Sequence, residues 1–583
     1  MRRRLSVTLL AIAVLVLAGC ANIPEESTPH AVRDEQQIVP EAAERPPTPN
    51  LNAFDLVREF VKRSGNPEAA SMYLTDKAKE QWPADSKPYV IHDTFSTVPM
   101  SNDDQKQSGE DQGGVESGRV VVVLRVTQIG TLGQDNAFIP RIGNPEFRVG
   151  VVRENGQWRI DAPPEHVYVP YSYFKTSYRA VTVYYFDPDL RITVPDQRYV
   201  PAAPAAGLPA RVIKVLLSGP SDSIRRSVVS PLEGVGARTN VVPDADGTLV
   251  VDLNPLGDKS EEQREKIAAQ IVLSLQTVTS SRLRIKGDNV DLIQGHGDWR
   301  LSDIKQYDTA TKPGPDQQGL LVSGGRLRML QDGKAAPGPA GEGAYDVVSA
   351  AQSIDGEQLA VVTQVDGRLR LRVGRYGEAL QEVALDATTM SRPTWRVSTG
   401  DDQDAGEVWT VEDGNVVRVV RAGDETWRSV EVNASALNEN FGSITELRLS
   451  RDGTRAAIVT SRGWVVLAAV VRDKDSVSLA LPRTLSPTMI VNAVGVDWLN
   501  QHTLVVATRQ PQMPVINLSL DGLTIDHYDP NNLQLPVRAI TAAPDREVVV
   551  TDSAAVSVVS GLGQVWHRLQ NGQGPSSIPF YPG

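Results

Sequence analysis

A turn motif that recurs along residues 316–583 constrains the fold of this chain more than any other feature. Asp355, Asp452 and Asp545 each lie in a turn-like tetrapeptide that precedes a strand-like run, and they are 97 and 93 residues apart. That spacing is about twice the ~40–45 residues of a propeller blade. Short strand-like runs between these turns are separated by Gly, Asp and Asn, which is typical of four-stranded blades. The repeat therefore predicts an all-β propeller over residues 316–583.

The two ends of this segment indicate how such a ring closes. Residues 320–322 and 326–330 look like the middle strands of a blade that lacks its first strand. The tail, residues 577–581, is predicted to supply that strand, because this pairing removes the exposed edges of an open array. Five complete units and one shared unit give six blades, and five or seven blades stay open as alternatives.

Residues 51–175 are predicted to form a small α+β domain, because helical patterns come first and strand patterns follow. Val57 and Val61 recur at helical spacing, and a second helix is predicted over residues 68–82. Residues 101–118 are polar and rich in glycine, which indicates a mobile loop. The predicted strands cover residues 120–129, 146–153 and 157–161, with a hairpin turn over 154–157.

A second α+β domain is predicted over residues 176–300, followed by a linker over 301–315. Ser260 and Gln263 have the spacing of a capping box at the start of an amphipathic helix. Strands are predicted over residues 179–186, 211–217, 248–253, 283–286 and 290–292. Residues 210–220, Ala-Arg-Val-Ile-Lys-Val-Leu-Leu-Ser-Gly-Pro, together with the strand after Gly247 and the helix over 261–279, resemble the GerMN domain of spore-germination and envelope lipoproteins.

The N-terminus has the pattern of a secretory signal over residues 1–19. Three arginines at positions 2–4 precede an apolar run over residues 7–17. As a helix this run spans roughly 16 Å, about half of the ~30 Å hydrocarbon core of a bilayer. The run ends in Leu17-Ala18-Gly19-Cys20, which resembles the lipobox of bacterial lipoproteins. The resemblance implies cleavage between Gly19 and Cys20 and a diacylglyceryl group on the Cys20 thiol. A chance cysteine is the alternative, but Cys20 is the only cysteine of the chain.

Residues 20–50 are predicted to be a disordered tether. They contain six prolines and six acidic residues and little that is apolar, so they cannot form a packed core. The net charge of the chain is −12, which disfavours both nucleic-acid binding and adhesion to anionic lipid. Two acyl chains give stable anchoring without such adhesion. We therefore expect a lipid-anchored protein at the extracytoplasmic face of the cell membrane.

The patterns that can carry chemistry also have structural explanations. No two of the seven histidines lie within ten residues of each other, which disfavours a local metal pair. His296, in a Gly-His-Gly-Asp sequence, is the most site-like, although a loop position is favoured. Ser302 and Lys305 fit the Ser-x-x-Lys pattern of penicillin-recognising enzymes, but the chain contains no Lys-Thr-Gly partner. We expect no catalytic, cofactor-binding or metal site, and hence a protein that is not an enzyme.

Acidic and aromatic residues are also expected to be structural. The carboxylates of Asp355, Asp452 and Asp545 are predicted to cap local backbone donors in turns. Clustered acids are expected to be solvated surface: Asp103, Asp104, Asp401, Asp402 and Asp404. Six of the nine tryptophans lie in the predicted propeller, where blade packing is expected to bury most of them: Trp395, Trp409, Trp427, Trp464, Trp498 and Trp566.

The order of lipobox, GerMN-like domain and propeller resembles the LpqB family of actinobacterial lipoproteins over essentially the full length. The resemblance implies an N-palmitoyl and an S-diacylglycerol group on Cys20. It further implies association with the extracellular domain of the membrane sensor kinase MtrB, in the MtrA/MtrB two-component system, and a regulatory role in envelope homeostasis and division. The alternative is an envelope glycan-binding or glycan-hydrolysing protein, since many propellers are hydrolases.

Overall fold

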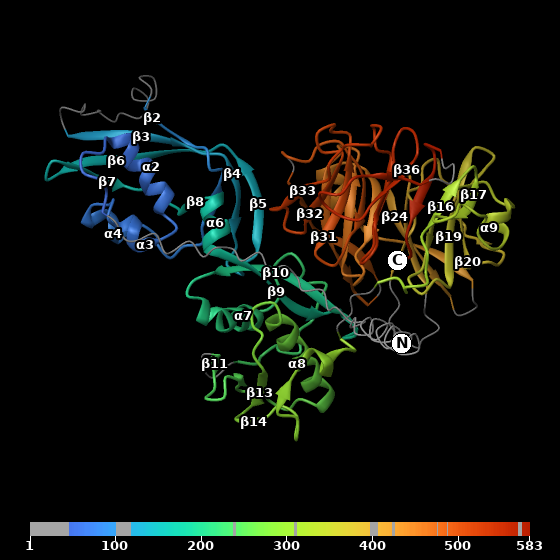
Figure 1. The fold of residues 1–583 in the computed structure, drawn as a ribbon, viewed down its shortest axis with the longest axis horizontal. Helices are drawn as coiled ribbons and strands as arrows, with labels where there is room; N and C mark the ends of the chain where they lie inside the picture. The colour runs from blue at the N-terminus through green and yellow to red at the C-terminus, as the bar shows by residue number, and fades with distance from the viewer. Residues whose placement is uncertain are drawn as a thin grey trace, which may run out of the picture. The chain divides into compact units, whose positions relative to one another are not determined.

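A computed structural model describes most of the chain, drawn in Figure 1. The described residues are 46–100, 118–236, 241–307, 312–396, 406–422, 426–474, 476–486, 488–569 and 574–583. The predicted signal peptide, Cys20, most of the predicted tether and nearly all of the predicted loop over 101–118 lie outside them. So do Asp103, Asp104, Asp401, Asp402 and Asp404. None of the described helices is long and apolar enough to cross a bilayer.

The first domain begins with three helices, α2 (Ala53–Arg63), α3 (Pro67–Ser71) and α4 (Asp76–Gln81). Asn52 caps α2 by accepting a hydrogen bond from the Asp55 backbone, and Val57 and Val61 are buried as predicted. The single helix predicted over 68–82 is wrong, because the chain turns between α3 and α4. There Leu74 forms a β-bridge to Ile160, and the next residue, Thr75, caps α4.

Two four-stranded sheets complete this domain, in the orders β5-β4-β1-β8 and β2-β3-β6-β7. The predicted hairpin turn joins β6 to β7, with Asn155 and Gly156 both at positive φ. The run predicted as one strand over 120–129 is divided between β3 and β4. The strands are β1 (Tyr89–Ile91), β2 (Ser96–Pro99), β3 (Arg119–Arg125), β4 (Gln128–Leu132), β5 (Phe138–Gly143), β6 (Glu146–Glu154), β7 (Gln157–Ala162) and β8 (Tyr168–Pro170).

The second domain starts after α6 (Tyr171–Ser177) with a long antiparallel hairpin, β9 (Tyr178–Phe186) and β10 (Thr193–Pro201). The strand predicted over 211–217 is wrong, because these residues form the helix α7 (Leu208–Leu217). The β-branched Val and Ile residues favour a strand locally. However, Pro209 in the first turn favours a helix start, and Val212 and Leu216, four residues apart, are both buried.

A βαβ unit forms the rest of this domain. β12 (Leu249–Leu253) and β13 (Leu283–Gly287) are parallel, and α8 (Glu261–Leu275) connects them. The capping box of Ser260 and Gln263 at the start of α8 is confirmed. The remaining elements are η2 (Ala205–Gly207), β11 (Val242–Pro243), β14 (Val290–Asp291), β15 (Asp298–Trp299) and η3 (Leu301–Ile304).

The C-terminal region is propeller-like and consists of six small antiparallel sheets within the described part of residues 312–583. The first sheet contains β17 (Arg326–Met329), β16 (Leu320–Ser323) and β38 (Ile578–Phe580). The second and third contain β18 (Val347–Gln352), β19 (Gln358–Val365), β20 (Arg368–Arg375) and β21 (Gln381–Glu382), then β22 (Thr394–Trp395), β23 (Glu407–Glu412), β24 (Asn415–Arg421) and β25 (Trp427–Glu431).

The last three sheets follow the same up-and-down order. They contain β26 (Ile444–Leu449), β27 (Arg455–Thr460), β28 (Val465–Arg472) and β29 (Val477–Thr484), then β30 (Ala493–Trp498), β31 (Thr503–Thr508), β32 (Val515–Ser519) and β33 (Ile525–His527), then β34 (Ala539–Thr541), β35 (Val548–Thr551), β36 (Val556–Val559) and β37 (His567–Arg568). Two short helices, α9 (Pro339–Glu342) and α10 (Ser435–Phe441), lie in connections.

The predicted pairing of the two ends of this region is confirmed. β38 pairs with β16, and Phe580 lies opposite Leu320. The first strands of successive sheets also contact one another in order, from β38 through β18, β22, β26, β30 and β34 back to β38. The apolar cores lie between neighbouring sheets; one of them combines Trp409 of β23 with Leu447 of β26. Each sheet thus buries its faces against its neighbours.

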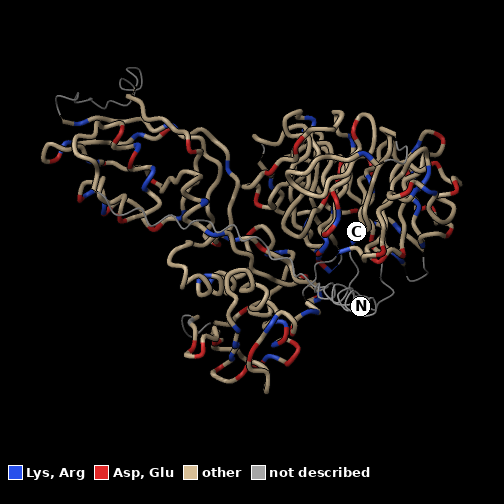
Figure 2. Tube along the Cα trace, in the orientation of Figure 1, with Lys and Arg blue, Asp and Glu red and all other residues tan. Residues whose placement is uncertain are grey.

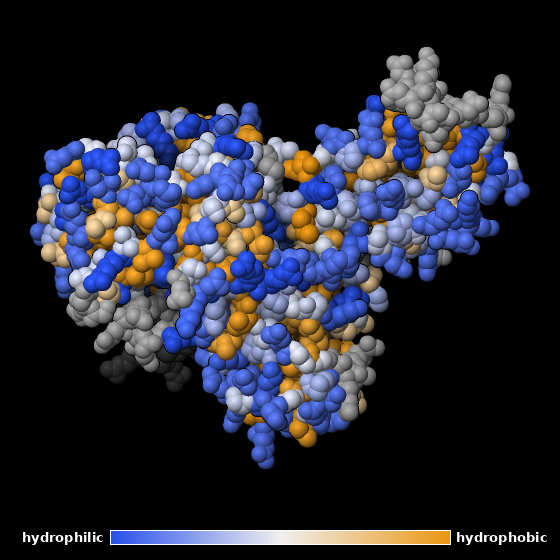
Figure 3. Space-filling view, turned by 180° about the vertical axis from the view of Figure 1, so that it is seen from behind, coloured by the Kyte–Doolittle hydropathy of each residue, from blue (hydrophilic) through white to orange (hydrophobic). Residues whose placement is uncertain are grey.

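The charges of the described residues are mixed along the chain. Figure 2 shows Lys and Arg interspersed with Asp and Glu in every region. On the face drawn in Figure 3, hydrophilic residues predominate and apolar residues form small scattered patches. Neither view shows one large charged or apolar patch.

Candidate functional site

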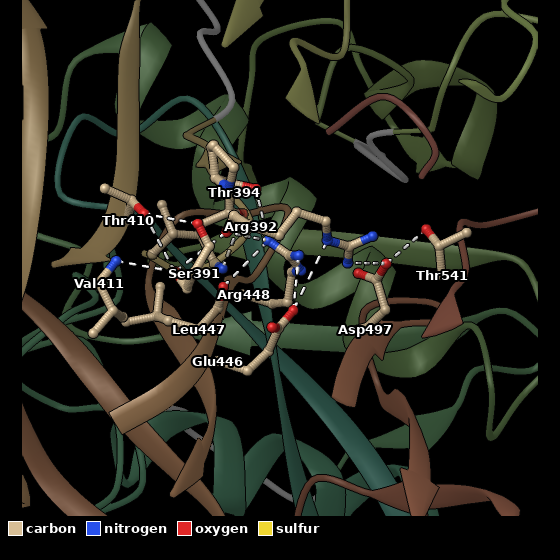
Figure 4. Close-up of polar contacts among 12 residues, drawn as sticks. Ser391, Arg392, Thr394, Thr410, Val411, Glu446, Leu447, Arg448, Asp497 and Thr541 are labelled. Atoms are coloured by element: carbon tan, nitrogen blue, oxygen red, sulfur yellow. Dashed lines mark hydrogen bonds and ion pairs between the residues drawn. The ribbon is translucent and has the colours of Figure 1, made fainter. Parts of the chain in front are cut away.

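A buried network of charged side chains lies on the first strands of the propeller-like sheets (Figure 4). Arg392 precedes β22, Glu446 and Arg448 lie on β26, and Asp497 lies on β30. Arg392 and Arg448 are only 8% and 3% exposed. On β26 these polar residues alternate with Leu447 and Leu449, which face the apolar core, as the two-residue period of a strand requires.

The two arginines of this network link four of the first strands. Arg392 donates from Nη2 to Oδ2 of Asp497 at 3.1 Å and from Nη1 to the carbonyl of Pro579 on β38 at 3.0 Å. Arg448 donates to Oε1 of Glu446 at 2.8 Å and to the carbonyl of Pro393 at 2.7 Å. Asp497 also accepts from Oγ1 of Thr541, on β34, at 2.8 Å. These bonds connect parts of the chain that are far apart in sequence.

Burial changes the pKa of Glu446 and that of Arg451, which interacts with Asp497. Burial raises the pKa of Glu446 to about 7; the Arg392 guanidinium opposes this rise and the Asp497 charge adds to it. Burial lowers the pKa of Arg451 to about 10, with Asp497 acting in the opposite direction. Arg451 donates to the carbonyl of Pro582 at 3.2 Å, beyond β38. The Glu446 carboxylate accepts from Arg448 and the Asp497 carboxylate accepts from Arg392, so each carboxylate faces a guanidinium group. This arrangement is that of a structural brace.

Hydroxyl groups beside Arg392 extend the network to the third sheet. Thr410 donates to the carbonyl of Ser391 at 2.9 Å, and Oγ of Ser391 accepts from the backbone of Val411 at 2.9 Å. Sequence analysis missed this network. The available signal was the presence of charged residues inside otherwise apolar strand runs, as in Thr-Glu-Leu-Arg-Leu at 445–449.

A second buried polar cluster, which we call the β10 junction, lies where β10 meets the first domain and the propeller-like region. Arg198 is fully buried and donates to Oδ2 of Asp196 at 2.6 Å and to the carbonyl of Asp135. Tyr199 donates from its hydroxyl to Oδ2 of Asp521 at 2.6 Å. Arg455, the first residue of β27, donates to the carbonyl of Pro195. Residues of β10 thus bond to both neighbouring regions.

The titration of the β10 junction follows from its burial and its charges. Burial alone would raise the pKa of Asp196, but the Arg198 guanidinium and the backbone of Ser221 hold it below its ordinary value. Burial lowers the pKa of His502 to about 4, and the nearby Arg455 adds to this effect. Asp196 is therefore ionised and His502 is neutral at neutral pH.

The residues singled out from sequence occupy mostly local structures. His296 lies in a turn bridged to Ile293. Its ring contacts Trp299 in a tilted arrangement, with centroids 4.1 Å apart, and its Nε2 is 3.5 Å from Oδ2 of Asp303. Ser302 donates to Asp303 at 3.2 Å on the surface. A search of the described residues finds no group of three His, Cys, Asp or Glu side chains that could hold a metal ion.

The predicted turn function of the repeated aspartates is confirmed for two of the three. Asp355 and Asp452 accept from the backbones of Glu357 and Thr454, both at 2.9 Å. Asp545 is different: its backbone has φ 59°, as in a turn, but its carboxylate pairs with Lys312 at 2.7 Å. Five of the six tryptophans are buried, and Trp464 is partly buried against the same core as Trp409.

Comparison with known proteins assigns the chain to a family. The family models for the LpqB N-terminal domain, for sporulation and spore germination (Germane) and for the LpqB β-propeller domain match residues 46–175, 182–291 and 325–582. Lipoprotein LpqB of Mycolicibacterium smegmatis is 30% identical over 100% of both chains. The chain belongs to the LpqB lipoprotein family.

Other members of the LpqB family match over the same extent. Lipoprotein LpqB of Rhodococcus opacus is 28% identical over 100% of this chain and 99% of its own. Lipoprotein LpqB of Mycobacterium tuberculosis is 29% identical over 100% of both chains. The LpqB family is named for lipoproteins, which agrees with anchoring by lipid, and its C-terminal domain is described as a β-propeller, which agrees with the six sheets.

Proposed function

We propose that this protein is a lipid-anchored, extracytoplasmic accessory protein that regulates a membrane sensor kinase of the MtrB type and has no catalytic activity of its own. The observation that carries the proposal is full-length similarity to lipoproteins in a chain whose only cysteine ends a lipobox-like sequence, Leu17-Ala18-Gly19-Cys20. The MtrB-type kinase is inferred from the resemblance to the LpqB family. A shared membrane favours the encounter, because it raises the effective concentration of both proteins.

We propose further that the C-terminal region is a closed propeller of six blades that acts as the rigid binding platform. Three observations support this form: six successive sheets, the pairing of β38 with β16, and contacts between neighbouring first strands in an unbroken order. The braces from Arg392 and Arg448 add to its rigidity, because each joins separate strands through charge-assisted hydrogen bonds.

A glycan-hydrolysing function is the second candidate, and Glu446 is the observation that favours it. A carboxyl group with a pKa of about 7 near a second carboxylate is typical of a general acid. In this protein, however, Arg448 donates to Glu446 and Arg392 donates to Asp497. Since both carboxylates are engaged by guanidinium groups, a structural function explains them better than acid–base catalysis.

Crosslinking in native membranes tests the proposed function. The lipidated full-length chain, carrying a photoreactive residue at exposed Leu562 of the propeller-like region, is expected to capture a membrane histidine kinase, and the same chain with the photoreactive residue at exposed Val290 of the second domain is expected not to. Cleavage of peptidoglycan or arabinogalactan fragments that is lost in Glu446→Gln would instead establish the hydrolase. If the anchored chain captures no kinase from any of several exposed positions, the regulatory proposal is wrong.

A further inference from the structure

One end of the fourth, fifth and sixth propeller-like sheets exposes arginine and apolar side chains together. At this end a hairpin turn joins the second and third strands of each sheet, and the chain passes on to the next sheet, so we call it the hairpin end. Apolar surface bordered by polar groups is typical of contact sites for proteins or membranes. The exposed apolar and cationic residues of the hairpin end are Met489, Val491, Leu535, Arg462, Arg509 and Arg538.

Hydrogen bonds connect the loops that carry these residues. The segment 485–492 leads from β29 to β30, and its Val491 backbone donates to Oε1 of Gln510 at 3.1 Å, in the hairpin turn of the fifth sheet. The backbone of Ala493, directly after this segment, donates to the carbonyl of Gly463 at 3.0 Å, in the hairpin turn of the fourth sheet. One connecting segment is thus bound to the hairpin turns of two neighbouring sheets.

Leu535 and Arg538 lie in the next connecting segment, between β33 and β34. The Arg538 backbone donates to the carbonyl of Thr551 at 2.7 Å, and the Ser553 backbone donates to the carbonyl of Gln534 at 2.8 Å. Both bonds join this segment to the hairpin turn of the sixth sheet. The loops of the hairpin end therefore hold their exposed side chains in place across three sheets.

The three arginines of the hairpin end are not neutralised by ion pairs. Within the part of the chain that the structure describes, no carboxylate pairs with Arg462, Arg509 or Arg538. Arginines on other strands of the propeller-like region are paired, as Arg370 is with Glu382 at 2.8 Å. The guanidinium groups of the hairpin end are therefore available to an anionic partner.

Few acidic groups accompany these arginines. The segment 485–492 contains no charged residue. Asp552, in the hairpin turn of the sixth sheet, is fully buried and accepts from the backbone of Gln534 at 2.8 Å. Asp529 is exposed, and it accepts from the backbone of Asn531 at 2.9 Å. The loops of the hairpin end thus present more positive than negative charge to a partner.

We propose that the hairpin end docks on the anionic phospholipid surface of the membrane that holds the chain, with its guanidinium groups on lipid phosphates and Met489, Val491 and Leu535 among the headgroups. A guanidinium group binds phosphate oxygens in a planar, charge-assisted arrangement. Apolar side chains beside cationic ones are typical of structures that lie on a membrane. The net charge of −12 disfavours adhesion by the chain as a whole, but in this arrangement only the hairpin end faces the lipid.

A membrane fits these observations better than an acidic protein does. The exposed residues are spread over one end of three sheets, so they can touch a planar surface together. The docking rests on the lipid anchor of the proposed function, because that anchor keeps the membrane at a high effective concentration. The loop of Leu562 joins β36 to β37 at the opposite end, so docking directs it away from the lipid.

The docking is expected to orient the chain and not to replace its anchor. One arginine near an anionic membrane surface strengthens binding about fivefold. Salt screens this contribution, so added salt releases a chain that is held by the hairpin end alone. Membrane fractionation in high salt therefore still reports on the lipid at Cys20.

Co-sedimentation with vesicles tests the surface in the mature chain, residues 20–583, prepared with Cys20→Ser so that it carries no lipid. Saturable binding to vesicles of dioleoylphosphatidylglycerol is expected, with binding to vesicles of dioleoylphosphatidylcholine weaker by about tenfold or more. Arg509→Gln and Arg538→Gln are each expected to lower the affinity for the anionic vesicles about fivefold. Met489→Glu is expected to abolish binding, because it places a negative charge among the apolar side chains.

Two variants at the opposite end of the sheets are the matched controls. Arg375→Gln, at the exposed last residue of β20, and Leu562→Glu are expected to leave vesicle binding unchanged. All the altered side chains are exposed, so the thermal unfolding profile of each variant is expected to stay that of the parent chain.

The proposal is overturned if the parent chain does not bind the anionic vesicles, if it binds both kinds of vesicle equally, or if Arg509→Gln and Met489→Glu bind as well as the parent. Binding of poly-L-glutamate without binding of vesicles would assign the surface to an acidic protein and would also overturn it. A lipid on Cys20 without vesicle binding would contradict the docking alone. Vesicle binding by a protein whose natural Cys20 carries no lipid would contradict the anchor alone.

Discussion

The guanidinium group of Arg392 donates to the carboxylate of Asp497 at 3.1 Å, although 105 residues separate them. Arg392 precedes β22 and Asp497 lies on β30, so the pair connects the third sheet to the fifth across the β26 strand between them. Both side chains are nearly buried, at 8% and 12% exposed. The propeller-like region is thus held together by a charge pair as well as by apolar packing between neighbouring sheets.

The first prediction concerns the cost of breaking this pair. Asp497→Asn keeps the shape of the side chain but removes the charge that Arg392 pairs with at 3.1 Å, so that only the Glu446 carboxylate, 3.8 Å away, still faces the buried guanidinium. Breaking a buried ion pair in this way typically costs about 3–5 kcal/mol of unfolding free energy. Urea unfolding followed by tryptophan fluorescence measures the loss. Asp526→Asn, at an exposed residue of β33, is the control and is expected to change stability by less than about 0.5 kcal/mol. Equal stability of the two variants would show that the pair is dispensable.

The second prediction concerns the pairing of β38 with β16. Phe580 is 2% exposed in the core beneath the first two sheets, so Phe580→Ala is expected to cost about 3–5 kcal/mol. Hydrogen exchange at the backbone amides of Leu320 and Val322 should accelerate, because these residues lose their partner strand. Ser576→Ala, at an exposed position just before the strand, is expected to leave the exchange unchanged. Unaltered protection in Phe580→Ala would mean that β38 does not stabilise the first sheet.

The third prediction concerns the bond between Tyr199 and Asp521 at the β10 junction. Tyr199→Phe removes a donor to a buried carboxylate, and a hydrogen bond to a charged group contributes about 1.5–3 kcal/mol. Faster hydrogen exchange is expected in β10 and in the turn over residues 519–523, with little change in β35. Tyr171→Phe is the control, because the Tyr171 hydroxyl has no hydrogen-bond partner among the described residues. Exchange that is the same in both variants would contradict the proposed importance of this bond.

The fourth prediction is a pH dependence that His502 causes. Its pKa is lowered to about 4 by burial, whereas a histidine in an unfolded chain has a pKa of about 6.5. Between these values the unfolded chain binds the additional proton, so stability falls as the pH is lowered from about 6.5 towards 4. His502→Gln lacks this contribution, so its unfolding free energy should fall by about 2–3 kcal/mol less than that of the unaltered chain over that range.

The control for this prediction is His527→Gln, at an exposed histidine of β33. Unfolding free energies are measured by urea titration at pH 7 and at pH 4.5, so that contributions shared by all variants cancel. The His527→Gln curve should follow that of the unaltered chain. Parallel pH curves for His502→Gln and the unaltered chain would show that His502 is protonated in the folded protein.

The sequence predicted best the features that depend on neighbouring residues. The capping box of Ser260 and Gln263 and the turn at Asn155 and Gly156 are local, and both are present. The pairing of β38 with β16 was also predictable, because the first sheet lacked a strand and the tail contained one. Residues 211–217 were predicted wrongly as a strand, since packing against α8 and β9 outweighs the local preference of Val and Ile.

The buried polar clusters were beyond sequence reasoning for a physical reason. Arg392 and Asp497, or Tyr199 and Asp521, meet only after separate regions have folded, and no spacing in the sequence records that contact. The burial of Arg455 could not be predicted either, because arginine is usually exposed.

The most direct test of the whole account is mass spectrometry of the mature N-terminus, together with fractionation of Cys20→Ser. The account predicts that the N-terminal peptide begins at Cys20 and carries a diacylglyceryl group, and that Cys20→Ser is released from membranes or left unprocessed. An unmodified Cys20 thiol, or membrane anchoring that persists in Cys20→Ser, would contradict it.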